Sequence, residues 1–323
     1  MIPFRQVVIW GNKLDSGDTF SFIHYGLNRV SRFMGFKTLW LNASDNLPQI
    51  DLSRTLFLTE GGAKKLPIRK DCWYVVFNYD RLINDIDDAF AEGRAIAYQH
   101  WNGRGSECYL AMEKVGEMAY LDGTKLLHLP WATDRIPPEI AAIRDRLSAP
   151  TVRRCAFVGS MNWSGPPFDM DKQWGPFISA CERGGVPFVC GRNRRYQCQT
   201  SNYAGRKMLF NYPEEAVTYV CRSLLAPSIQ GHWQCEVGHL GDRIFKNLSY
   251  GKLGITNNLH IEALLGEHCV FCENTEKLFG MAMDAVQSRP PARVMAAMRL
   301  VAEKHTYVNR INAMLKALEV VAK

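Results

Sequence analysis

One segment in the second half of the sequence has the residue types and spacing of an anion-binding site. Residues 242–250 have a helical pattern, Gly241 precedes them, and Gly251 ends the pattern. The first turn of a helix carries backbone N–H groups without intrahelical partners at the positive end of the helix dipole, so a diphosphate fits there. Arg243 in the same turn can add a charge-assisted contact to phosphate. The segment therefore predicts binding of a phosphorylated ligand.

Other polar residues of this half follow segments with an apolar, strand-like pattern. They are Gly159 and Ser160, Gly191 and Arg192, Gln230 and Gly231, and Asn257 and Asn258. In sheets of parallel strands, ligands bind beyond the carboxyl ends of the strands. A tight turn explains any single glycine among them equally well. Their shared position after strands nevertheless favours one common ligand site.

Two carboxylates and a histidine follow the first strand-like segment of the chain. Asp15 and Asp18 lie in a polar loop, and His24 lies about one turn into the helix that follows. A carboxylate in such a loop can act as a general base. We predict Asp18 as the base, with Asp15 and His24 as alternatives. A helix-capping role explains Asp18 equally well, and His24 also fits a half-buried helix position.

Short apolar segments alternate with helical patterns along the chain. We expect strands at 7–10, 38–41, 54–58, 73–77, 95–98, 125–129, 154–158, 187–190, 209–210, 223–227, 253–256 and 268–272, and helices at 22–33, 177–184, 214–222, 242–250 and 261–266. Strands that are apolar on both faces and separated by helices predict parallel sheets covered on both sides.

The predicted fold class is therefore α/β, with two Rossmann-like domains that face each other across a cleft. The Pro-rich segment 136–150 separates the two sets of strands and holds a short helix. The predicted boundaries are a first domain at 1–150, a second at 151–300, and a C-terminal helix at 301–323 that packs back toward the first domain.

With this organisation in place, residues 243–257 resemble the donor-binding motif of the GT-B glycosyltransferases, Arg-hydrophobic-Phe-Glu-Ala followed by Gly and Thr-Asn. The run His305-Thr306-Tyr307-Val308-Asn309-Arg310 resembles the last helix of family-1-like bacterial and viral enzymes of this fold, and residues 9–26 resemble their first strand, loop and helix. The resemblance implies transfer of a sugar from a UDP- or GDP-sugar donor to a hydroxyl acceptor, with no cofactor. It implies donor binding by Asp242, Arg243, Ile244 and the loop residues named above.

The sequence departs from the family pattern at two positions. Lys246 and Asn247 stand where many members have Glu and Ala. That Glu commonly binds a hydroxyl of the donor, so the resemblance does not imply a particular sugar. We expect Asn247 or Asn257 to supply the hydroxyl contact instead. No Asp-x-Asp motif follows a strand, so we expect no catalytic metal.

The acceptor site is expected in the first domain. Asp80, His100 and Trp101 follow strands of the first domain and are the predicted acceptor contacts; an indole in a loop can stack on a sugar or a nucleobase. A saccharide or glycoconjugate is the first acceptor class, and DNA with hydroxymethylated pyrimidines is the second. A non-catalytic nucleotide-sugar-binding protein is the alternative of another class. A dehydrogenase is disfavoured because no GxGxxG motif follows a strand.

Composition and charge limit the class of protein and its ligands. The chain has 323 residues, a net charge of +7 and ten cysteines. The charge fits an anionic ligand or simple solubility. Cys269 and Cys272 have CxxC spacing without a second such pair, so the cysteines predict free thiols and a cytoplasmic location. We expect neither a membrane-spanning helix, since no run of about 18 apolar residues occurs, nor a signal peptide.

Overall fold

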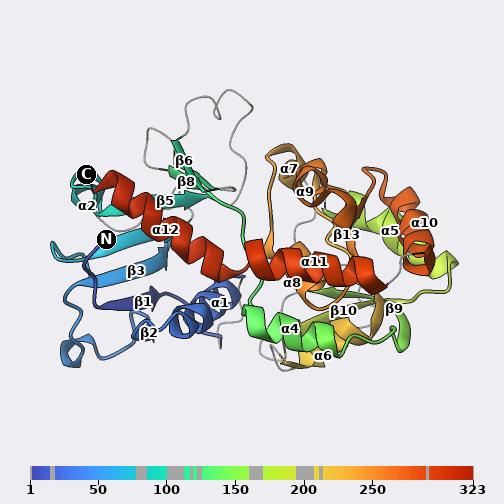
Figure 1. Ribbon diagram of the computed structural model, residues 1–323, viewed down its shortest axis with the longest axis horizontal. Helices are drawn as coiled ribbons and strands as arrows, with labels where there is room; N and C mark the ends of the chain where they lie inside the picture. The colour runs from blue at the N-terminus through green and yellow to red at the C-terminus, as the bar shows by residue number, and fades with distance from the viewer. Residues whose placement is uncertain are drawn as a thin grey trace. The chain divides into compact units, whose positions relative to one another are not determined.

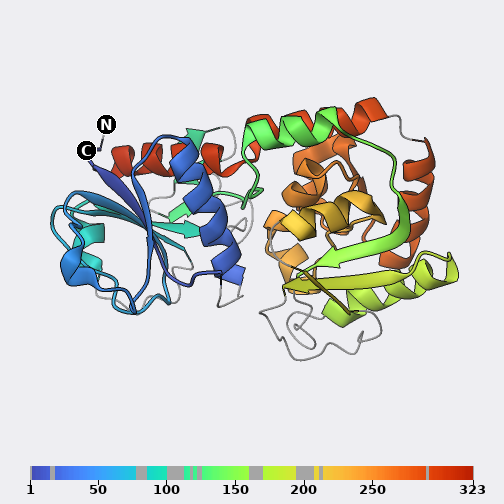
Figure 2. The ribbon, with the colours of Figure 1, turned by 90° about the horizontal axis from the view of Figure 1, so that it is seen from below.

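The computed structural model describes residues 2–14, 19–77, 86–99, 113–116, 119–121, 126–159, 170–193, 207–210, 214–288 and 291–322. The chain forms two compact units (Figures 1 and 2). The first unit contains Met1–Ile136 and Thr306–Lys323, and the second contains Pro137–His305. No helix among the described residues has the length and apolar character needed to cross a membrane.

The first unit is built on an eight-stranded sheet with the strand order β2-β1-β3-β4-β5-β8-β7-β6. The strands are β1 (Gln6–Trp10), β2 (Thr38–Leu41), β3 (Thr55–Glu60), β4 (Trp73–Phe77), β5 (Ala95–Gln99), β6 (Glu113–Gly116), β7 (Ala119–Leu121) and β8 (Leu126–His128). The pairs from β2 to β8 are parallel, as the sequence predicts, whereas β6 and β7 add an antiparallel hairpin. The strand order reverses at β1.

Alternating side chains of β1 supply both faces of this sheet. Val7 and Ile9 belong to a core that includes residues of α1 (Thr19–Phe33) and α12 (Tyr307–Val321). Val8 and Trp10 belong to the opposite core, which includes Ala89 of α2 (Asp87–Ala91). Successive side chains of a strand point to opposite faces. The continuous apolar run of β1 therefore reflects a sheet covered on both sides.

The second unit has the strand order of a doubly wound sheet. A four-stranded parallel sheet has the order β11-β10-β9-β12, and β13 pairs in parallel with β14. A parallel bridge between Ser228 and Thr256 links the segment after β12 to β13. These strands are β9 (Val152–Val158), β10 (Phe188–Asn193), β11 (Lys207–Phe210), β12 (Ser223–Leu225), β13 (Gly254–Thr256) and β14 (Cys269–Phe271). The order reverses between β9 and β12, and ligands of such sheets bind at that point, beyond the carboxyl ends of the strands.

Helices of the second unit pack in three clusters. The described helices are α4 (Pro137–Asp145), α5 (Met170–Arg183), α6 (Glu214–Arg222), α7 (His232–Glu236), α8 (Asp242–Ser249), α9 (Leu259–Leu265), α10 (Thr275–Ser288) and α11 (Pro291–Lys304). The 3-10 turn Gly266–His268 precedes β14. Helices α5 and α10 share a core with Phe157 and Ile255. Helices α4, α8, α9 and α11 share another, and α4 lies beside α11 (Figures 1 and 2).

Packing explains why the first division of the chain lies before α4, whereas the sequence analysis places it at residue 150. Ile140 of α4 is buried in the same cluster as Ile244 and Phe245 of α8. Helix α4 therefore belongs to the second unit, and the chain divides between Ile136 and Pro137. At the other end, residues 301–304 belong to α11, and α12 begins only at Tyr307.

The His305–Arg310 motif has a structural role in this fold. Buried Arg310 donates hydrogen bonds to the carbonyl oxygens of Pro130 (2.7 Å) and Trp131 (2.9 Å). Thr306 is the N-cap of α12, with a capping box to Asn309. Tyr307 packs on Gly26, where a Cβ would lie 2.6 Å from the ring. The motif therefore fixes α12 on the first unit, next to α1 and β5 (Figure 1).

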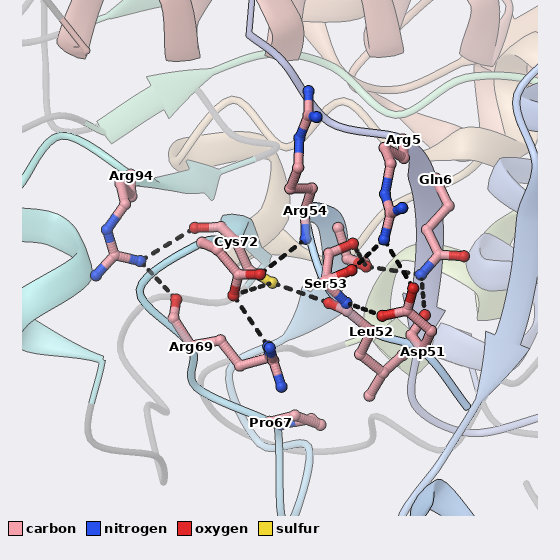
Figure 3. Close-up of polar contacts among 12 residues, drawn as sticks. Arg5, Gln6, Asp51, Leu52, Ser53, Arg54, Pro67, Arg69, Cys72 and Arg94 are labelled. Carbon is pink, nitrogen blue, oxygen red and sulfur yellow. Dashed lines mark hydrogen bonds and ion pairs between the residues drawn. The ribbon is translucent and has the colours of Figure 1, made fainter. Parts of the chain in front are cut away.

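A polar network joins the amino-terminal ends of the central strands of the first sheet (Figure 3). Arg5 pairs with Asp51 at 2.7 Å, and Gln6 donates to the carbonyl oxygen of Asp51 at 2.6 Å. Hydrogen bonds from Ser53 and, to a lesser extent, the Arg5 charge lower the pKa of the Asp51 carboxyl to about 2. Arg94, just before β5, donates to the carbonyl oxygen of Arg69 at 2.9 Å. This network lies opposite the carboxyl-end edge and holds the strand ends together.

Candidate functional site

A guanidinium lies at the carboxyl end of β9, where the strand order of the second unit reverses. Arg243 Nε donates to the carbonyl oxygen of Val158 at 3.2 Å, and the guanidinium carbon lies 4.2 Å from the centre of the Phe157 ring. Gly159 has φ +146°, and a Cβ there would lie 2.5 Å from Arg243 Nη2. Gly159 and Arg243, both predicted from the sequence, are therefore in direct contact.

The first turn of α8 brings further charges to this point. Lys246 Nζ pairs with the Asp242 carboxylate at 2.5 Å, one helical turn away. The charge of Lys246 thus compensates that of Asp242. Burial lowers the pKa of Arg243, and Asp242 opposes that shift; an arginine stays charged at neutral pH. The site therefore offers a cation for an anionic ligand.

Helix α8 is held so that its N-terminus faces this region. Gly241 is the N-cap in an extended conformation (φ −70°, ψ 160°) and makes no side-chain capping bond. Ile244 is fully buried in the core of the unit, so it holds the helix in place. Asn247 is buried, and its Nδ2 donates to the carbonyl oxygen of Ala226 after β12 at 2.8 Å. The Asn247 amide, which was predicted to contact a donor hydroxyl, already holds α8 to the segment after β12.

The segment after β12 is fixed by amide side chains. Asn257 accepts from the backbone N–H of Gln230 at 2.8 Å and donates to its carbonyl oxygen at 2.9 Å. Asn258 Nδ2 donates to Gln230 Oε1 at 2.5 Å. Gly231 donates its N–H to Gln234 Oε1 at 3.0 Å and is the N-cap of α7. The structure therefore brings together Gln230, Asn257 and Asn258, which the sequence analysis singled out separately.

His239 joins this group, although the sequence analysis did not include it. Gln230 Nε2 lies 2.7 Å from His239 Nδ1 and donates to the His239 carbonyl oxygen at 3.1 Å. Burial lowers the pKa of His239 to about 4; the Asp242 charge opposes this shift and Arg243 adds to it. The imidazole is therefore neutral at physiological pH. In the sequence, His239 could have been identified by its position two residues before Gly241, the N-cap of α8.

Two predicted residues lie in a strand, not in a loop. β10 continues through Gly191 and Arg192 to Asn193, beyond the predicted end at residue 190. Gly191 pairs with Met208 and Arg192 with Leu209 of β11. The expected post-strand loop at Gly191 and Arg192 was therefore wrong, because pairing with β11 extends the strand.

His24 is fully buried in α1 of the first unit. Its Nδ1 donates to the carbonyl oxygen of Asn12 at 3.1 Å, and its ring packs on Gly11, which has φ +148°. Aromatic rings surround it, with that of Trp40 centred 6.5 Å away. His24 thus fixes the start of the loop after β1. Asp15, Asp18, Asp80, His100, Trp101 and Ser160 lie outside the described residues.

Comparisons with known proteins bear on the fold. No protein-family model and no curated protein sequence matches the chain. Among solved structures, it is similar to an alpha-glucosyltransferase in complex with UDP and a 13-mer DNA containing a HMU base (TM-score 0.58, 10% identity, 99% of each chain). It is also similar to the T4 phage enzyme BGT in complex with UDP-glucose (TM-score 0.51, 9% identity, 98% of this chain and 99% of that one).

A third similar structure is the UDP-forming alpha,alpha-trehalose-phosphate synthase from Burkholderia vietnamiensis (TM-score 0.50, 10% identity, 99% of this chain and 95% of that one). The similarity extends over nearly the full length of all these chains, and the sheets of both units are doubly wound and largely parallel. At such low identity the likeness establishes the fold alone. The chain therefore has the GT-B fold of two-domain glycosyltransferases.

Proposed function

We propose that this protein is a glycosyltransferase that moves a sugar from a nucleoside-diphosphate donor to a hydroxyl acceptor. The observation that carries the proposal is the position of Arg243, held over Gly159 at the N-terminus of α8 and at the point where the strand order reverses. A cation and a helix N-terminus at that point suit a diphosphate. The fold shared with UDP-binding enzymes supports the same ligand class.

The proposed reaction breaks the bond between the sugar's anomeric carbon and the diphosphate oxygen. Negative charge then develops on the leaving diphosphate, and Arg243 with the first N–H groups of α8 would stabilise it. The acceptor oxygen forms the new bond to the anomeric carbon and loses its proton to a base. Asp18 remains the predicted base, with Asp15 as its alternative. Fully buried His24 is better suited to hold the start of that loop than to contact a substrate.

The donor is proposed to be a UDP- or GDP-sugar, bound without a catalytic metal. Turnover in the presence of a chelator tests the last point, because a metal-dependent enzyme would lose activity. The proposed location is a reducing cytoplasm, because the cysteine spacing predicts thiols and not a disulfide framework.

A saccharide or glycoconjugate is the first proposed acceptor. DNA is the second, because the alpha-glucosyltransferase of the same fold is bound to DNA with a HMU base and the BGT structure comes from a phage. The net charge of +7 is compatible with a polyanionic acceptor. Asp80, His100 and Trp101 stay the predicted acceptor contacts, and Trp101→Ala should raise the acceptor KM more than the donor KM.

Donor binding is tested first by thermal shift with UDP, GDP and ADP and their glucose derivatives. A ligand that binds only the folded state raises the melting temperature, so at least one nucleotide should do so. The bound donor is then incubated with hydroxymethylated DNA and with oligosaccharides. Transfer to either identifies the acceptor class, and Asp18→Asn should abolish transfer while preserving donor affinity. Donor binding without transfer or hydrolysis would favour the non-catalytic alternative, and no stabilisation by any nucleotide contradicts the proposal.

A further inference from the structure

A chain of hydrogen bonds in the second unit fixes the orientation of two amide side chains. The backbone N–H of His260 donates to Asn258 Oδ1 at 2.8 Å. Because the oxygen of this amide is thereby identified, its nitrogen must face the other way. It donates to Gln230 Oε1 at 2.5 Å and to the His239 carbonyl oxygen at 3.0 Å. The Gln230 amide is therefore oriented as well, with its oxygen toward Asn258.

The orientation of Gln230 determines which nitrogen of His239 carries the proton. Gln230 Nε2 lies 2.7 Å from His239 Nδ1 and 3.1 Å from the His239 carbonyl oxygen. An amide nitrogen can only donate, so Nδ1 must accept and has no proton. The neutral ring then carries its proton on Nε2. Asn257, which bonds both the N–H and the carbonyl of Gln230, holds the glutamine in place.

The same arrangement opposes a positive charge on the ring. A proton on Nδ1 would put two donors face to face across 2.7 Å. Burial acts in the same direction and lowers the pKa of His239 to about 4. Near neutral pH, His239 is thus an uncharged donor with a fixed tautomer.

The ring lies directly against the start of α8. A Cβ on Gly241, the N-cap of the helix, would lie 2.9 Å from His239 Cε1 and 3.6 Å from Gln230 Nε2. The charges of Asp242 and Arg243 both act on the ring. His239 therefore belongs to the same site as the proposed diphosphate contacts.

We propose that His239 Nε2–H donates a hydrogen bond to a hydroxyl group of the transferred sugar, and that Gln230 is the positioning residue that keeps the proton on Nε2. This inference rests on the proposed function. A diphosphate is matched by the cationic Arg243 and the helix N-terminus, since charged donors bind anions most strongly. A neutral imidazole N–H donor instead suits an uncharged oxygen, such as that of a hydroxyl group. His239 is accordingly a sugar-binding residue, and its contact distinguishes a nucleotide sugar from the nucleoside diphosphate alone.

The test compares the affinities of UDP and UDP-glucose, with the GDP and ADP pairs included, by calorimetry. His239→Phe should weaken UDP-glucose binding by about tenfold and leave UDP binding within about twofold, as expected for one lost hydrogen bond. Arg243→Lys should weaken both. His239→Gln keeps an uncharged N–H donor and should recover part of the loss. A deoxy sugar that lacks the contacted hydroxyl should bind the wild type and His239→Phe equally.

Gln230→Glu tests the positioning role. A carboxylate beside Nδ1 accepts where the amide donates, so the proton should move to Nδ1. Nitrogen NMR of labelled histidine should show the Nε2–H tautomer in the wild type and its loss in the variant, together with the sugar-specific loss of affinity. Melting temperatures identify variants that fail to fold, and the wild-type tautomer can be read without any variant.

Three results would overturn the inference. Equal losses for UDP and UDP-glucose in His239→Phe would place the ring on the diphosphate or give it a structural role, and the proposed function would stand. An Nδ1–H tautomer in the wild type would contradict the hydrogen-bond chain. If the wild type bound none of the nucleotides, the proposed function itself would fail and the inference with it.

Discussion

The Arg243 guanidinium lies so close to Gly159 that a Cβ on residue 159 would stand 2.5 Å from Nη2. The first unit contains the same relationship. Gly11 after β1 has φ +148° and lies against the His24 ring. Gly159 after β9 likewise has φ +146° and lies against Arg243. In both units a glycine after the first strand makes room for a helix side chain at the carboxyl end of that strand. In the second unit, the side chain is a cation.

Gly159→Ala should therefore affect both stability and ligand binding. The conformation at φ +146° is one that L side chains rarely adopt, so we expect a loss of about 1–3 kcal/mol in the free energy of unfolding. The new methyl group should also displace Arg243 and weaken UDP binding by about tenfold. Gly185→Ala is the matched control, because Gly185 has φ +64° but nothing within 4 Å of its Cβ position. It should lose stability and keep UDP affinity; equal affinities in both variants would contradict the prediction.

Arg243→Lys should weaken UDP binding by about 10- to 100-fold, since lysine keeps the charge but loses the planar donor set. It also loses the bond from Nε to the Val158 carbonyl. Calorimetric titration with UDP measures the effect. The control is Arg183→Lys at an exposed ion pair with Glu276 in the same unit, where affinity should not change. Unchanged UDP affinity in Arg243→Lys would remove Arg243 from the binding site.

The strands were predictable where an apolar run is long and buried on both faces. β4 at Trp73–Phe77 has the expected bounds. β2 at Thr38–Leu41 also has the expected bounds, although it is a half-buried edge strand. The hairpin of β6 and β7 was not expected, because Glu113–Gly116 has no apolar run and its pairing with β7 is a tertiary property. The break between α11 and α12 had a local signal in the capping box of Thr306 and Asn309.

The site was predictable only for residues that a strand end or a helix start identifies. Gln230 and Asn258 follow different parallel strands that end at one edge of the sheet, and their amides hydrogen-bond to each other. Arg243 Nε donates to the Val158 carbonyl oxygen at the end of β9. The role of His239 depends on an amide that is distant in the sequence and oriented by Asn258. No local pattern contains that information. Conversely, Asn247, which stands where the family pattern has Ala, was a predicted hydroxyl contact, but its amide donates to the Ala226 carbonyl.

Arg310→Met should destabilise the fold without removing a ligand contact. The substitution leaves two buried carbonyl oxygens, of Pro130 and Trp131, without the bonds from Arg310. Tyr98 still donates to the Pro130 oxygen at 3.2 Å, so we expect a loss of about 2–4 kcal/mol in the free energy of unfolding in urea. Lys316→Met on the exposed face of the same helix is the control and should change stability little. A loss as small as the control's would contradict the role assigned to Arg310.

The buried state of His239 predicts a pH dependence of stability. The pKa of its imidazole is lowered from 6.5 to about 4 by burial in the folded protein. Between these values the unfolded chain binds a proton that the folded chain does not, so stability is complete above pH 6.5 and is lost as the pH falls toward 4. His239→Gln removes this contribution.

Urea unfolding of both proteins at about pH 7 and about pH 5 should show a larger loss of the free energy of unfolding in the wild type than in the variant. The difference at about pH 8, where the ring is neutral in both states, gives the pH-independent cost of the substitution. Parallel losses between about pH 7 and about pH 5 would show that His239 titrates as freely in the folded protein as in the unfolded chain.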